Sequence, residues 1–187
     1  MAPAAIMLQL RYALALADTG ALGDAITHTG NILSSHPESH NARIIHGVLL
    51  CRKGEMDIGL DMIATSADAS PLYHLMAVET LDGQAKLALD AGRVEDAEHF
   101  WRLAAALAPD NPKYNARLGE ALLAGGKLEE AVQKFQSVLM VAPESPHTAA
   151  FMEEAFKRLN LPEARQRFWE TIVEAHPEAQ VPRQYLQ

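Results

Sequence analysis

The eight histidines and the single cysteine, Cys51, are the side chains in this sequence best suited to bind a metal or to act as a nucleophile. His36, His40 and His46 could approach one another across a turn, but no carboxylate or cysteine accompanies them at a spacing typical of metal ligands. His36 and His176 each precede a proline, where a histidine in a last helical turn gains about 0.3–1 kcal/mol from the helix dipole. The histidines therefore predict no metal site.

Cys51 is followed by Arg52 and Lys53, and neighbouring cations favour the reactive thiolate. A small, half-buried residue on an apolar helix is the simpler interpretation of the same position. The sequence contains no GxSxG, no phosphate-binding glycine loop and no HExxH motif. Paired carboxylates such as Glu129 and Glu130 are typical of solvated helix faces. We predict no catalytic residue, no cofactor and no enzymatic activity in this chain.

Composition narrows the class of partner and the compartment. The formal net charge of −8, with no run of more than two Lys or Arg, disfavours nucleic acid and anionic membranes as partners. One cysteine allows no internal disulfide, so we expect a reducing compartment, the cytoplasm. Gln9 and Arg11 interrupt the apolar N-terminal stretch, which is typical of an amphipathic helix rather than a signal peptide. No stretch reaches the roughly 20 apolar residues of a membrane span.

Five prolines recur at nearly constant spacing, 34, 38, 34 and 34 residues apart: Pro37, Pro71, Pro109, Pro143 and Pro177. Small residues recur upstream at matching offsets: Ala13, Gly47, Ala85 and Gly119, then Gly20, Gly54, Gly92 and Gly126, then Ala25, Gly59, Ala97 and Ala131. Four of the prolines follow a bulky residue by eight positions: Ile63, Trp101, Phe135 and Trp169. A fixed period of this length indicates a repeat architecture, in which the bulky residues belong to the core.

The pattern resembles the tetratricopeptide repeat, a helical hairpin of 34 residues whose small residues let two helices touch and whose proline ends the second helix. The resemblance implies an all-α fold, a right-handed superhelical solenoid of antiparallel helix hairpins, forming a single domain at 1–187. The repeats are expected at 6–39, 40–73, 74–111, 112–145 and 146–179, with a short C-terminal tail at 180–187. Four extra residues within 72–78 are expected to lengthen the first helix of the third repeat.

Turn and cap residues set the expected helix ends. The ten helices are predicted at 4–18, 22–35, 40–53, 56–69, 73–90, 94–107, 112–124, 128–141, 146–159 and 162–176. Glycines that tolerate the left-handed conformation close the first helices of four repeats, and Asn160 takes this place in the fifth. Asn111 and Ser145 each precede a proline and are predicted to cap the helices that follow.

The pattern is weaker at the two ends of the array. Thr29 occupies the bulky position of the first repeat, while Glu153 and Arg165 occupy two small positions of the fifth. Terminal repeats expose an apolar face that an extra polar helix usually shields. Here the tail can offer only Val181, Tyr185 and Leu186 to cover the surface formed by Phe156, Trp169 and Ile172. We expect this cover to be too small, so that a second protomer or a further segment completes the fifth hairpin.

In an array of this kind, one face of every first helix forms the concave wall. The first two repeats place mostly apolar residues there: Met7, Leu10, Leu14, Asn41, Ile44 and Val48. Later repeats place charged residues there: Lys86, Lys113, Arg117 and Glu120. We predict that these ten residues line a groove for a partner peptide or helix. Four of them are expected to be accessible in a monomer and covered by a partner: Leu10, Leu14, Ile44 and Val48.

The predicted function is therefore a protein–protein interaction scaffold. Two alternatives stay open: the recognition domain of a larger enzyme of glycosyltransferase or methyltransferase type, and a self-assembling scaffold that forms homo-oligomers through its terminal repeats. Some members of the resembled family bind chaperone C-termini with a clamp of Lys and Asn side chains. Lys113 and Arg117 fit two positions of that clamp, but Gly83, Ile44 and Val48 occupy the others, so this ligand is disfavoured.

Overall fold

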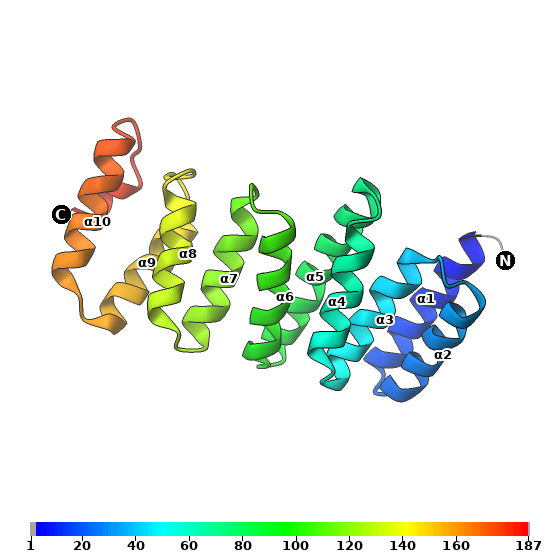
Figure 1. Ribbon diagram of the computed structural model, residues 1–187. Helices are drawn as coiled ribbons and strands as arrows, with labels where there is room; N and C mark the ends of the chain where they lie inside the picture. The colour runs from blue at the N-terminus through cyan, green and yellow to red at the C-terminus, as the bar shows by residue number, and fades with distance from the viewer. Residues whose placement is uncertain (1–2, 187) are drawn as a thin grey trace. The chain divides into compact units, whose positions relative to one another are not determined.

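The computed structural model describes residues 3–186, which form ten α-helices and one short C-terminal 3-10 helix without any β-strand (Figure 1). The helices are α1 (Pro3–Asp18), α2 (Leu22–Ser35), α3 (His40–Lys53), α4 (Met56–Ala67), α5 (Pro71–Asp90), α6 (Val94–Leu107), α7 (Pro112–Ala124), α8 (Leu128–Leu139), α9 (Pro146–Leu159) and α10 (Pro162–Ala175), followed by η1 (Pro182–Tyr185). The predicted all-α fold of successive antiparallel helix pairs is confirmed. The predicted helix ends agree to within two residues.

The chain divides into two compact units, residues 1–84 and 85–187, and the boundary lies within α5. In the N-terminal unit, α1 packs on α2, α2 on α3 and α3 on α4, and α1 also contacts α3. In the C-terminal unit, α7 packs between α6 and α8, α8 contacts α9, and α10 contacts both α9 and η1. Each unit therefore has the neighbour-to-neighbour packing of stacked hairpins. The single domain predicted for the whole chain stays a prediction.

Local residue chemistry explains where the helices start and stop. Four glycines and one asparagine have positive φ at the predicted turns: Gly20 at 93°, Gly54 at 100°, Gly92 at 73°, Gly126 at 78° and Asn160 at 54°. The side chains of Asn111 and Ser145 accept hydrogen bonds from the backbone N–H groups of Lys113 and Thr148, so both predicted caps are confirmed. α5 has 20 residues and α7 has 13, which confirms that the insertion lengthens the first helix of the third repeat.

The small residues of the repeat allow the helices of a hairpin to approach closely. A Cβ atom added to Gly47 of α3 would lie 2.6 Å from the carbonyl oxygen of Gly59 in α4. In the fourth repeat, a Cβ atom added to Gly119 would lie 2.5 Å from the ring of Phe135. Trp101 and Trp169, both predicted to be core residues, are buried. The sequence pattern thus reports the interior of the hairpins correctly.

Candidate partner-binding site

The predicted apolar wall of the first two repeats is largely internal. Leu10 and Ile44 are 1% exposed and Val48 is 0% exposed, whereas Leu14 is half-buried and Met7 is 38% exposed. The expectation that Leu10, Ile44 and Val48 are accessible in the monomer is therefore wrong.

The packing of the N-terminal unit accounts for much of this burial. Leu10 packs in a cluster with Ile32 of α2 and Ala42 of α3, so first helices contact each other as well as their hairpin partners. The Nδ2 atom of Asn41 lies 3.4 Å from Sδ of Met7, which adds a polar contact between α1 and α3. Leu10 thus forms part of the interior that holds neighbouring repeats together, while Met7 and Asn41 meet in a more exposed contact.

The charged part of the predicted groove is exposed or half-buried and partly organised into pairs. In α7, Arg117 donates to Glu120 with an Nη1–Oε2 distance of 2.8 Å. The other carboxylate oxygen of Glu120 lies 3.3 Å from Nε2 of His147 in α9. Nζ of Lys113 lies 5.0 Å from the centre of the neighbouring Tyr114 ring. The structure therefore brings Arg117 and Glu120 together and joins them to α9 through His147; Lys86, on the C-terminal part of α5, is exposed.

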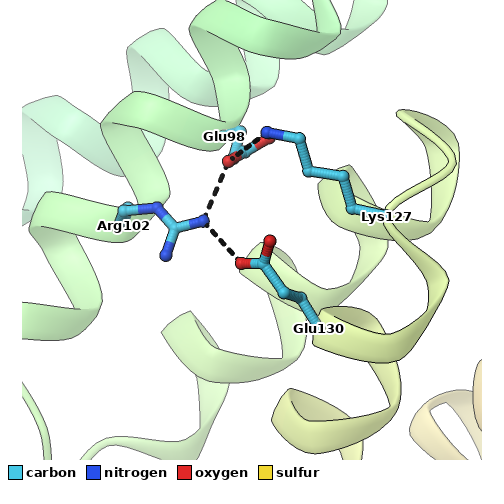
Figure 2. Close-up of polar contacts among 4 residues, drawn as sticks. All are labelled: Glu98, Arg102, Lys127 and Glu130. Atoms are coloured by element: carbon cyan, nitrogen blue, oxygen red, sulfur yellow. Dashed lines mark hydrogen bonds and ion pairs between the residues drawn. The ribbon is translucent and has the colours of Figure 1, made fainter.

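A second charge network joins α6 to the start of α8. Figure 2 shows Glu98 between Lys127 and Arg102, and Arg102 reaching Glu130. Nζ of Lys127 lies 2.9 and 2.8 Å from the two Glu98 oxygens, and Nη2 of Arg102 lies 2.9 Å from Glu98 and 3.0 Å from Glu130. Because α6 and α8 both pack on α7, this network stabilises the second helices that position the charged wall. Nothing in the repeat pattern singled out these four residues.

Burial alone would raise the pKa of Glu98, but hydrogen bonds from Lys127 and Arg102 hold that pKa below its usual value. The contribution of this carboxylate to stability is therefore present above the unfolded-state pKa of about 4.5 and is lost as the pH falls through the lower folded-state value. We expect Glu98→Gln to lower the free energy of unfolding at neutral pH by about 1–2 kcal/mol. Urea unfolding at a series of pH values measures this difference, which should shrink on acidification.

The matched control is Glu130→Gln, because Glu130 also bonds Arg102 but its side chain is 48% exposed. Its replacement should change the unfolding free energy little at any pH, as is usual for surface ion pairs. A Glu98→Gln deficit that stays constant from neutral to acidic pH would contradict the charge network.

Residues 83–147 match the family model of the tetratricopeptide repeat. The fold is similar to that of a solved structure of a MamA mutant, with a TM-score of 0.57 and 18% identity over 73% of this chain and 97% of that one. Residues 83–147 therefore form tetratricopeptide repeats.

Two further solved structures are similar to this chain. A second MamA structure has a TM-score of 0.50 and 12% identity over 92% of each chain. YrrB, described as a TPR protein with an unusual peptide-binding site, has a TM-score of 0.49 and 14% identity over 94% of this chain and 89% of that one. No curated protein matches the sequence.

The departures from the tetratricopeptide pattern are explained by polar contacts. In the first repeat, Oγ1 of buried Thr29 lies 2.6 Å from Nδ1 of His46 in α3, so a hydrogen bond replaces the packing of a bulky side chain. Burial lowers the pKa of His46, and the charge of Glu55 opposes this shift. In the fifth repeat, Glu153 and Arg165 bond each other with an Nε–Oε2 distance of 2.8 Å. Two residues that are each too large for a small position thus form an ion pair.

The C-terminal tail of the chain covers the last hairpin. The ring of Tyr185 stacks on Trp169 at a centroid distance of 4.7 Å, as the predicted cover requires. Trp169 and Ile172 are 0% exposed and Phe156 is 5% exposed. The expectation that this cover is too small is therefore wrong for these three residues, because the stacked ring and the turn of η1 occupy the space beside α10.

Two further findings concern other classes of function. Within residues 3–186, no helix is both long enough and apolar enough to cross a membrane. Over the same residues, no three His, Cys, Asp or Glu side chains lie close enough together to hold a metal ion.

Proposed function

We propose that this chain is a protein–protein interaction scaffold and that it binds a segment of its partner along α7 and α9. The observation that supports this site is the cluster of Arg117, Glu120 and His147, which places both signs of charge on one wall. Lys113 extends the same wall by about one helical turn. Paired charges of this kind fix the register of a bound segment and disfavour segments with the wrong charge pattern.

The apolar half of the predicted groove contributes few accessible residues to this proposed binding site. Because Leu10, Ile44 and Val48 are buried, Met7, Leu14 and Asn41 are the only wall residues of the first two repeats with more than slight exposure. Binding specificity is therefore assigned to the charged residues of the later repeats. Lys86, on the last turns of α5, is predicted at the corresponding wall position of the third repeat.

The test uses peptides selected from a random displayed library against the purified chain and then measured by fluorescence anisotropy. Lys113→Glu combined with Arg117→Gln should weaken binding by about tenfold or more, since one lost charged contact is worth about 1.4 kcal/mol. The matched control, Lys134→Glu combined with Arg167→Gln, alters a lysine and an arginine on the second helices α8 and α10. Equal loss in both double variants, or no loss in the first, would overturn the site.

A further inference from the structure

The first helices α3, α7 and α9 each have a buried face that contacts the preceding hairpin. This stacking face consists of the third, seventh and tenth positions of a repeat. In α3, Ala42 clusters with Ile32, His46 bonds Thr29, and Leu49 clusters with Ala25, so all three positions contact α2. The corresponding residues of α7 and α9 are all buried, and those helices pack on α6 and α8: Tyr114, Leu118, Ala121, Thr148, Met152 and Ala155.

The stacking face of α1 is open. Leu8 is 68% exposed, Tyr12 is 57% exposed, and Ala15 is exposed as well. The ring of Tyr12 lies with its edge against His28 of the same hairpin, at a centroid distance of 5.6 Å. In α3, α7 and α9, the residues at the positions of Leu8, Tyr12 and Ala15 are covered by the second helix of the preceding hairpin. The lengthened α5 differs, because Leu87 at its tenth position is exposed. The exposed face of α1 therefore has the residue positions of a surface on which another helix stacks.

The C-terminal tail occupies the matching site on α10 in the register of a sixth repeat. Tyr185 stacks on Trp169 at an interplanar angle of 16°, as Phe151, 34 residues earlier, stacks on Phe135 at 10°. Arg183 donates to the carbonyl oxygen of Pro177, as Arg43 does to that of Pro37. Pro182 is buried at the third position, like Ala42 in the second repeat. The surface of α10 thus accepts the start of a first helix.

We infer that α1 of a second copy docks on α10 in place of the tail, so that copies join head to tail through the spacing of the repeat. This contact goes beyond the partner site on α7 and α9. In this register Arg11 of the incoming α1 takes the position of Tyr185 and faces the Trp169 ring, which favours a cation. Arg11 is the only charged residue on α1 apart from Asp18, whereas α10 exposes Glu163, Glu170 and Glu174 against Arg167. Arg11 is therefore the charge of α1 that complements the acidic surface of α10.

One pair of charges opposes this contact and gives a sharp test of its register. Glu170 and Asp24 of the incoming copy stand at the positions that Arg102 and Glu130 occupy between the third and fourth repeats. The natural chain should associate weakly, because two carboxylates meet there and the tail must leave. Glu170→Arg recreates the Arg102–Glu130 pair and should strengthen association.

Sedimentation velocity of the full chain over a wide concentration range tests the proposal. Arg183→Ala combined with Tyr185→Ala releases the tail and should tighten self-association by about tenfold or more, and Glu170→Arg should tighten it further. Adding Tyr12→Glu should abolish association. Ile58→Glu is the matched control, because Ile58 is also 57% exposed but belongs to neither α1 nor α10, and it should change nothing.

A mixing experiment separates this contact from a symmetric α1–α1 dimer. A tail-released chain that carries Tyr12→Glu can dock only through its α10 surface, and a chain with its tail intact can dock only through its α1 surface. The two chains should therefore form one-to-one pairs. A tail-released Glu170→Arg chain that stays monomeric would overturn the proposal, as would association that survives Tyr12→Glu. Circular dichroism checks that each variant is folded. If the tail-released chain unfolds, the association of Glu170→Arg with the tail intact is measured in its place.

Discussion

Val48→Glu is expected to unfold the N-terminal unit rather than to alter a binding surface. Val48 is 0% exposed, and a carboxylate at this position would lose its hydration without gaining a partner. Burying an unpaired charge belongs to the few single changes that cost about 4 kcal/mol or more. Both tryptophans lie in the C-terminal unit, so their fluorescence does not report directly on this unit. Hydrogen exchange of the α1–α4 amides is the suitable measurement.

The control for this prediction is Met7→Glu, a change of similar chemistry on the same predicted wall. Met7 is 38% exposed, so a glutamate there can remain hydrated and should leave the exchange of α1–α4 nearly unchanged. If Val48→Glu also left those amides protected, Val48 would have to be accessible, and the apolar groove predicted from the sequence would be restored.

Helix positions could be predicted from this sequence because their signals are local. A glycine that adopts positive φ, such as Gly126, or an asparagine that caps the next residues, such as Asn111, acts within a few positions of itself. Exposure of the wall depends instead on how closely separate helices approach. Repeat position assigned Leu10 and Val48 to an accessible wall, but the close approach of neighbouring helices buries both side chains.

The polar residues that depart from the repeat pattern could not be predicted to pair, because each is explained only by a contact with a partner distant in the sequence. In sequence, Glu153 and Arg165 are two separate defects of the fifth repeat, twelve residues apart. In the structure they form one ion pair, and Glu153 also accepts a hydrogen bond from the indole N–H of Trp169 at 2.5 Å. Thr29 and His46 follow the same logic between two repeats. Compensation of this kind depends on three-dimensional proximity, which a pattern of residue sizes does not record.

Gly59→Ala is expected to destabilise the N-terminal unit by about 1–3 kcal/mol or more through overpacking. A Cβ atom at this position would overlap the carbonyl oxygen of Gly47 and Sγ of Cys51. A side chain can rotate away from a new methyl group, but the Gly47 carbonyl is part of α3 and cannot. Relief therefore requires α3 and α4 to move apart, which weakens the whole helix pair. The shift in the urea midpoint of α3 protection, followed by hydrogen exchange, measures the loss.

Gly83→Ala provides the matched control, since Gly83 also lies inside a helix but has open space where its Cβ atom would be. Alanine should stabilise α5 by about 0.5–1 kcal/mol, because it restricts the unfolded chain more than glycine does. The same gain in helix propensity is present in Gly59→Ala, so the difference between the two variants isolates the close approach of α3 and α4. Equal stability of the two variants would mean that these helices are farther apart than the contact of Gly47 with Gly59 requires.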